Sequence, residues 1–355
     1  RLTNVDVIVA GGSNTGLFDA NDRPRPGDTA QGEYPIFTTD ADGNPVAIVN
    51  TDGNYKYIGR LVVDFDENGI ILPESYDADV SGAYATDDEG VAALGAEGLV
   101  DPDVQDIVDT LEEVIIAGES NLFGISEVYL NGVRSSVRTE ETNLGNLTAD
   151  ANLAIAKEAD ETVVISIKNG GGIRDDIGQS IVPPGGTGEP VLLPNEEIPG
   201  VKPEGGISET DIANTLRFNN GLTLLTITAE ELLAVIEHGG AESVAGDDSV
   251  TAGRFPQVAG IEFSFDLTAE PGDRVQSLAI LDDEGNDADV IVQEGELVGD
   301  AARTFRMVTL GFLAGGGDGY PFPERDVVDL SQEDDAPRTG DATFAADGSA
   351  QDALA

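Results

Sequence analysis

Two glycine-rich loops are the first places where this chain could do chemistry. Residues 169–174, NGGGIR, follow the apolar run TVVISI, and residues 315–320, GGGDGY, follow another apolar run. Glycine lacks a Cβ, so backbone N–H groups in such a loop can approach a ligand closely, and Arg174 can bind an anionic oxygen. Asp318 offers a carboxylate to sugar hydroxyls. Taken alone, each loop is equally compatible with an ordinary turn after a strand, with Asp318 as a capping residue.

Basic and aromatic side chains supply the other candidate contacts. Arg134 and Arg138 lie four residues apart in a chain with only 18 lysines and arginines. They share one face whether the segment is extended or helical, which favours an anion site, although each could instead pair with one of the many acids. Phe218 and Asn220 stand in RFNNG, where a helix is expected to turn into a strand. Phe218 is compatible with stacking on a ligand and also with packing in the core.

The composition excludes several classes of function. The 355 residues carry 68 acidic and 18 basic side chains, a net charge of −50, which repels nucleic acids and anionic membranes. We interpret this surface as suited to salty surroundings, with a calcium-loaded surface as the alternative. There are no cysteines, so disulfides, thiolate metal sites and a cysteine nucleophile are excluded. No apolar run is long enough to cross a bilayer.

The single histidine, His238, limits both metal and nucleophile chemistry. One histidine cannot build a site with several imidazole ligands, and it leaves one candidate partner for a catalytic serine. His238 lies in the last turn of an expected helix, where a histidine interacts well with the helix dipole. This position favours capping or packing over catalysis.

The first 119 residues are expected to form a β-rich region and a helix. Residues 1–80 read as short strands with Asp-Gly and Asn-Gly turns, beginning with a buried strand at 5–12. The stretch 81–100 has weak periodicity and reads as an exposed connection. Residues 101–119 read as a linker helix, capped by Asp101 and ending at a glycine. Both ends of the chain look like cuts through structure, so we expect a segment of a longer protein.

The remainder, residues 120–355, reads as a second domain of mixed helices and strands. Thr228 and Glu231 form the pattern of a capping box at the start of a helix. Residues 304–314, TFRMVTLGFLA, are expected to form one continuous strand. The stretch 182–206 is rich in proline and glycine and reads as an inserted surface loop without an element of its own. The whole is an α+β fold with a largely mixed sheet.

Taken in order, five segments resemble the C-terminal domain of the 5′-nucleotidase family. They are VRSSVRTEETNLGNLTADA, ISIKNGGGIR, LRFNNGLTLLTITAEELLAVIEHG, GRFPQVAGIEFSFD and GGGDGYPF. The resemblance implies a nucleotide- or nucleoside-binding domain. It implies that Phe218 and Phe312 sandwich the base and that Asp318 holds the ribose hydroxyls. It also implies further contacts from Asn169, Gly171, Gly172 and Asn220. The three arginines, Arg134, Arg138 and Arg174, would bind phosphate or the anionic end of the substrate.

Residues 1–100 are similar to the last β-rich part of the family's calcineurin-like metallophosphatase domain, in which a divalent metal pair is expected. The family's closing signature there includes a metal-binding histidine, but this chain reads AGGSNTG, with Gly12 at that position before Ser13 and Asn14. The earlier ligand motifs are absent. We therefore expect this chain alone not to hydrolyse nucleotides.

The resemblance leaves several functions open. The parent would be a secreted, periplasmic or cell-surface 5′-nucleotidase-type phosphoesterase that converts nucleoside phosphates to nucleoside and phosphate. One alternative is a non-catalytic extracellular protein that uses the same fold for nucleotide binding or for assembly. Another is a phosphoesterase of the same family that acts on sugar nucleotides or cyclic nucleotides, because a base-stacking pair does not distinguish these substrates.

Overall fold

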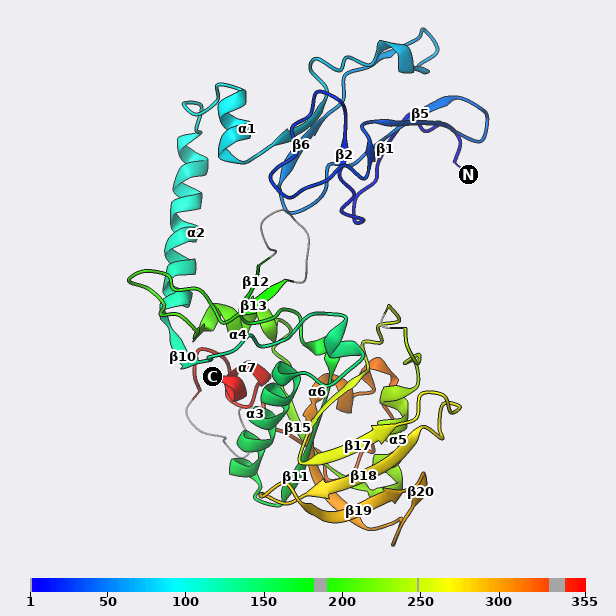
Figure 1. Ribbon diagram of the computed structural model, residues 1–355, viewed down its shortest axis with the longest axis vertical. Helices are drawn as coiled ribbons and strands as arrows, with labels where there is room; N and C mark the ends of the chain where they lie inside the picture. Colours follow the sequence, from blue (N-terminus) through cyan, green and yellow to red (C-terminus); the bar gives the residue numbers. More distant parts are fainter. Residues whose placement is uncertain (1, 182–189, 248, 332–341) are drawn as a thin grey trace. The chain divides into compact units, whose positions relative to one another are not determined.

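The computed structural model describes residues 2–181, 190–247, 249–331 and 342–355 (Figure 1). The chain divides into two compact units, residues 1–110 and residues 111–355. The division falls within helix α2, which spans Pro102–Ser120.

The first unit is built from short strands. A three-stranded sheet of order β1-β5-β4 combines Val7–Val9, Pro45–Val49 and Ile36–Thr39. Three further strand pairs and helix α1 (Asp88–Ala93) also belong to this unit. The pairs are β2 (Leu17–Phe18) with β3 (Gly32–Glu33), β6 (Tyr57–Arg60) with β9 (Gly82–Ala85), and β7 (Asp64–Phe65) with β8 (Ile71–Leu72).

Two predictions for this unit are wrong. The strand expected at 5–12 is shorter, and Val7 and Val9 are exposed because β1 is an edge strand that pairs with β5 among the described residues. The stretch 81–100 is not a plain connection, since it contains β9 and α1. Strand β9 is mostly buried against β6, and α1 is capped by the Asp87 side chain, which accepts from the Gly90 N–H.

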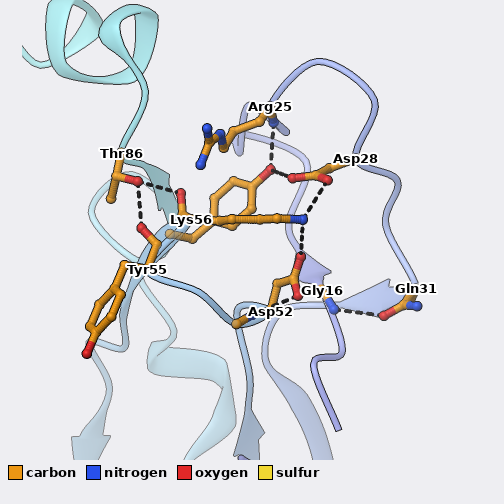
Figure 2. A network of polar contacts seen from close by, with 10 residues as sticks. Gly16, Arg25, Asp28, Gln31, Asp52, Tyr55, Lys56 and Thr86 are labelled. Carbon is orange, nitrogen blue, oxygen red and sulfur yellow. Dashed lines mark hydrogen bonds and ion pairs between the residues drawn. The ribbon is translucent and has the colours of Figure 1, made fainter. Parts of the chain in front are cut away.

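A cluster of polar side chains ties the turns of the first unit together (Figure 2). The Lys56 Nζ lies 3.1 Å from an oxygen of Asp28 and 3.0 Å from an oxygen of Asp52. The Tyr57 hydroxyl donates to Asp28 at 2.8 Å and accepts from the backbone N–H of Arg25 at 2.6 Å. The bond from Tyr57, followed by that from Lys56, lowers the pKa of the Asp28 carboxyl. The Asp28 carboxylate thereby joins the turn at residues 25–28 to the turn at residues 53–56.

Helix α2 begins as predicted and ends later. The Asp101 carboxylate accepts the backbone N–H of Asp103 at 2.9 Å, which is the bond expected of an N-cap. The helix continues past Gly118, so that glycine does not end it. Near its last turn, Glu119 pairs with the Lys202 ammonium at 2.5 Å. Within the described ranges, no helix combines the length and apolarity that a membrane span requires.

The second unit is organised around a mixed five-stranded sheet, as expected. Its order is β16-β11-β21-β15-β22, formed by Pro256–Ala259, Val163–Asn169, Thr304–Leu310, Leu222–Thr228 and Val328–Asp329. β11 and β21 are parallel, and the other neighbours are antiparallel. A separate antiparallel sheet has the order β17-β18-β19-β20 and combines Ile261–Phe265, Val275–Leu281, Asp287–Gln293 and Glu296–Leu297.

Helices pack on both sheets through a common apolar core. Helices α3 (Asn143–Ala159) and α7 (Ala350–Leu354) contact each other, and α3 covers strands of the five-stranded sheet (Figure 1). Helix α5 (Ala229–Gly240) packs against strands of both sheets. Its predicted capping box is present, with Thr228 accepting from the Glu231 N–H and the Glu231 side chain accepting from the Thr228 N–H. α4 spans Glu209–Thr215 and α6 spans Gly311–Ala314.

Two further predictions for the second unit need correction. The run ending at Ala314 is a strand only as far as Leu310, because α6 follows it. The stretch 182–206 does contain an element: β13 (Val191–Leu193) pairs with β12 (Gln179–Ile181), while residues 182–189 lie outside the described residues. In the same stretch Lys202 is buried and lies 3.1 Å from Asp211. The remaining pair joins β10 (Leu122–Ile125) to β14 (Gly206–Ser208).

Lys168 is the unusual residue of this core. It is 1% exposed, and its Nζ has no hydrogen-bond partner among the described residues. Burial lowers the pKa of its ammonium to about 7 from the ordinary 10.5. In the unfolded chain the Lys168 ammonium keeps its proton up to the ordinary pKa of 10.5. The free energy of unfolding therefore decreases as the pH falls from 10.5 towards 7, and the decrease is complete below pH 7.

We predict that Lys168→Met raises the free energy of unfolding by about 1–3 kcal/mol near neutral pH, the scale of an unpaired buried polar group. The gain should shrink as the pH rises from 7 towards 10.5, because the wild-type amine is neutral in both states only above the higher value. Urea unfolding over this pH range measures both values. Lys157→Met in the same region is the control, since Lys157 is partly exposed and paired with Asp283. A gain that is independent of pH would contradict the prediction.

Candidate functional site

Three loops meet at one edge of the five-stranded sheet. β11 and β21 run parallel with Ile167 opposite Thr309, so both strands end at this edge. β15 is antiparallel to β21, with Leu222 opposite Leu310, so the loop before β15 lies there too. We refer to these segments as the Asn169 loop (169–174), the Phe218 loop (216–221) and the Asp318 loop (311–319). Strand pairing thus brings together residues that are far apart in the sequence.

Glycines in the Asn169 loop allow close backbone packing. A Cβ on Gly170 would lie 1.7 Å from the Val137 carbonyl oxygen, and a Cβ on Gly171 would lie 2.8 Å from the Gly253 carbonyl oxygen. The N–H groups of Gly170 and Gly171 donate to the carbonyls of Phe255 and Gly253 at 2.7 and 2.8 Å. These two N–H groups are therefore not free to cradle a ligand, contrary to the simplest interpretation of the glycine run. The glycines instead allow residues 134–138, which include Arg134 and Arg138, to pack closely against the end of β11.

Three arginines gather beside this loop. Arg138 ends a short 3-10 turn, is 7% exposed, and its Nε has no hydrogen-bond partner among the described residues. Burial, followed by the positive charges of Arg134 and Arg174, lowers the pKa of its guanidinium, while Asp318 acts in the opposite direction. None of the three forms an ion pair with a carboxylate in the part of the chain that the structure describes. Pairing of these arginines with nearby acids, the alternative raised by the sequence, is thus not observed within the described ranges.

Asn169 and Asp318 connect two of the loops. The Asn169 Nδ2 donates to the Asp318 Oδ2 at 2.6 Å. Asn169 is buried, and its Oδ1 has no partner among the described residues. Asp318 is exposed and adopts a left-handed conformation with φ of 53°. The hydrogen bond to Asn169 thus holds the exposed Asp318 carboxylate at this edge of the sheet.

Phe218 and Phe312 expose their rings at the same edge. Phe218 is 61% exposed and Phe312 is 49% exposed, which excludes core packing for Phe218. The Arg174 Cζ lies 5.5 Å from the centre of the Phe218 ring, a cation–π distance. Asn220 is partly buried, and its carbonyl accepts the Ala350 N–H at 2.9 Å. A cavity of about 10 Å³, lined in part by Lys168, Gly172, Phe218 and Asn220, has room for about one water.

Several supporting residues received no site role from the sequence. Buried Gln257 donates its Nε2 to the carbonyls of Val137 and Glu140, at 3.1 and 2.8 Å, and so holds the segment that carries Arg138. The Tyr320 hydroxyl donates to the Arg254 carbonyl at 2.5 Å. The lone glutamine in the apolar run PQVAG was an available signal, because a buried amide must find partners.

The residues around Gly12 do not fit a metal pair. Gly12 has no side chain to donate, and a Cβ built on it would meet nothing within 4 Å. The Ser13 hydroxyl lies 2.8 Å from Thr15 Oγ1 and accepts from the Asn50 amide at 3.1 Å. Across the ranges that the structure describes, no group of three or more histidine, cysteine, aspartate or glutamate side chains could hold a metal ion.

The comparison with known families decides the relationship. A family model described as "5'-nucleotidase, C-terminal domain" matches residues 123–325, which is more than half of the chain. The chain belongs to the 5′-nucleotidase family. The match contains all three loops and both arginines of the pair at 134 and 138, so the site described above lies wholly within the shared domain of this nucleotidase-type protein.

The similarity to individual proteins extends beyond that domain. The snake venom 5′-nucleotidase of Naja atra is 29% identical over 339 residues, covering 94% of this chain and 55% of the relative. The 5′-nucleotidase of Homo sapiens is 28% identical over 325 residues, with 90% and 48% covered. The chain also resembles the crystal structure of a 5′-nucleotidase precursor from Thermus thermophilus, with a TM-score of 0.58 and 26% identity. That alignment covers 100% of this chain and 56% of the Thermus chain. The chain spans about half the length of each of these relatives.

We predict that Arg138→Met raises the thermal unfolding midpoint of the ligand-free protein. The substitution removes a buried cation that faces two others and keeps most of the apolar stem. Inorganic phosphate should stabilise the wild type and have little effect on the variant. Differential scanning calorimetry with and without phosphate measures both effects.

Arg306→Met is the control, because Arg306 is paired with Asp160. Its loss should lower the midpoint and leave the response to phosphate intact. An equal response to phosphate in Arg138→Met and in the wild type would show that Arg138 does not bind the anion.

Proposed function

We propose that this chain is the substrate-recognition portion of a 5′-nucleotidase-type phosphoesterase that hydrolyses nucleoside phosphates to nucleoside and phosphate. The observation that carries the proposal is the gathering of Arg134, Arg138 and Arg174 without a carboxylate partner in the described residues of a chain with a net charge of −50. Guanidinium groups pair readily with carboxylates and phosphates. Arginines without a carboxylate partner among the described residues of so acidic a chain are available for an anion that comes from outside.

A nucleotide matches the groups around the arginines. Phe218 and Phe312 would stack on the two faces of the base, and such stacking tolerates different bases because each has a π-face. Asp318, held by Asn169, would accept hydrogen bonds from the ribose hydroxyls. Gly172 and Asn220 would complete the contacts to the nucleoside, with Gly171 contributing only through its carbonyl oxygen because its N–H is bonded to Gly253, and the three arginines would bind the phosphate.

The chemical step would belong to a metallophosphatase-like domain, and we propose that residues 1–100 are its last part. The alignment with the Naja atra protein covers 94% of the chain and therefore extends well before residue 123, where the family match begins. Residues 101–119 would be the linker helix and 120–355 the binding domain. A divalent metal pair is expected in full-length relatives, but the residues around Gly12 do not fit one, so hydrolysis by this chain alone is not expected.

The presence of Gly12 also favours a second candidate. A parent that lacks the histidine would be a non-catalytic protein that binds nucleotides or serves an assembly role outside the cell. For either candidate we propose a secreted, periplasmic or cell-surface location. The acidic composition supports this location, since a highly charged surface suits saline surroundings. Several relatives are named as snake venom proteins.

We predict that adenosine 5′-monophosphate binds this chain and that Phe218→Ala and Phe312→Ala each weaken it roughly tenfold or more, since stacking contributes about 1–3 kcal/mol per base. Isothermal titration calorimetry measures the affinities. Phe65→Ala is a matched control, because Phe65 is 49% exposed, as Phe312 is, and belongs to the other unit. Equal affinity in all four proteins would exclude the stacking pair, and no binding to the wild type would overturn the proposed function.

We further expect no phosphate release from adenosine 5′-monophosphate when magnesium, manganese or zinc is added to this chain. The physical reason is the missing ligand set around Gly12. A colorimetric phosphate assay over long incubation tests it. Release that disappears in Asp318→Ala would contradict the expectation, because it would show turnover by this chain.

A further inference from the structure

Helix α5 carries the single histidine on a firmly held end. Buried Glu237, in the last turn, accepts the N–H of Val275 at 2.6 Å, and Arg274 donates to the Gly240 carbonyl at 2.6 Å. At its other end the helix is fixed by the Thr228 capping box. A side chain that projects from such an element has a well-defined position, which is what precise recognition requires.

His238 contacts the Asp318 loop and the residue after it in three ways. Its Nε2 lies 2.9 Å from the carbonyl oxygen of Asp318. Its ring meets the Tyr320 ring edge-on, with the centroids 5.1 Å apart. A Cβ on Gly319 would lie 3.3 Å from the imidazole Cε1, so the loop backbone lies directly on the ring. His238 therefore contacts three consecutive residues beginning with Asp318.

The carbonyl partner decides where the imidazole proton lies. A carbonyl oxygen only accepts, so the His238 Nε2 must carry a hydrogen to form the 2.9 Å bond. An Arg254 nitrogen lies 3.3 Å from the same atom, but a nitrogen that donates to Asp318 cannot also accept from Arg254. Arg254 has its own acceptor in Glu242. Neutral His238 is thus held in the Nε2–H tautomer.

Asp318 needs such a contact because its backbone is strained. Its φ of 53° is a left-handed conformation, which is unfavourable for a residue that carries a Cβ. The Asn169 amide holds the side chain of Asp318, and the His238 imidazole holds its carbonyl. Loss of the second contact would let the peptide rotate towards an ordinary conformation and move the carboxylate away from the site.

We propose that His238 is a positioning residue for ribose recognition. By donating to the Asp318 carbonyl, it fixes the conformation in which the Asp318 carboxylate faces the vicinal hydroxyls of a bound nucleoside. The inference deepens the proposed function and rests on it. It gives the only histidine of the chain a role in selecting ligands with a cis-diol, without contact between that histidine and the ligand.

The test uses two substitutions of His238 and two nucleosides. His238→Phe keeps a ring against Tyr320 and removes the donor, whereas His238→Gln keeps an amide donor at a similar reach. Adenosine carries both ribose hydroxyls, and 2′,3′-dideoxyadenosine carries neither. Calorimetry on the whole chain should show that His238→Phe lowers the affinity for adenosine roughly tenfold, the value of a hydrogen bond to a charged group, and leaves that for dideoxyadenosine unchanged. His238→Gln should retain most of the preference for adenosine.

Other outcomes overturn the inference. Equal weakening of both nucleosides in His238→Phe would show a general structural role, and an unchanged preference for adenosine would show no role. Equal affinity of the wild type for both nucleosides would show that Asp318 does not recognise the hydroxyls.

If the wild type binds neither nucleoside, the proposed function fails, and NMR without ligand decides the positioning role. Nitrogen-15 spectra of the single imidazole should show the Nε2–H tautomer, and the Gly319 and Tyr320 amides, which donate to Gly316 and Gly317, should exchange faster in His238→Phe. The other tautomer, or unchanged exchange, would overturn the role.

Discussion

The parallel pairing of β11 with β21 is the constraint on which the site depends. Parallel neighbours end at the same edge of a sheet, so this pairing places the Asn169 loop beside the Asp318 loop, which lies about 150 residues later in the chain. The antiparallel partner β15 adds the Phe218 loop to that edge. Gly170 then lets the Val137 carbonyl approach so closely that any side chain would clash, which brings Arg138 to the same place.

The energetic cost of this arrangement is electrostatic. Arg138 is buried near two other guanidinium groups, and Lys168 is buried one residue before the Asn169 loop without a partner among the described residues. Each lowers the stability of the ligand-free fold, since a buried charge is penalised unless it is paired. Such unpaired cations are unfavourable for folding and favourable for binding an anion. The large apolar core around β11, β15 and β21 supplies the stability that tolerates them.

Much of this was accessible from the sequence. The capping box of Thr228 and Glu231 predicts the start of α5, and the ordered family motifs predict the mixed sheet and the identity of the domain, because these signals are local or carried by several residues in a row. The partners of the glycines were not accessible. The sequence shows three glycines after a strand, but only the fold shows that two of their N–H groups bond the carbonyls of Gly253 and Phe255. The role of His238 was likewise hidden, since its partner is a backbone carbonyl 80 residues away.

We propose that the three loops form one binding site for a nucleotide. Hydrogen–deuterium exchange followed by mass spectrometry, with and without adenosine 5′-monophosphate, tests it most directly. On binding, exchange should slow in the peptides that contain residues 169–174, 216–221 and 311–319, in all three together, and should not change in residues 1–100. Protection of one loop without the others, or protection confined to the first unit, would contradict it.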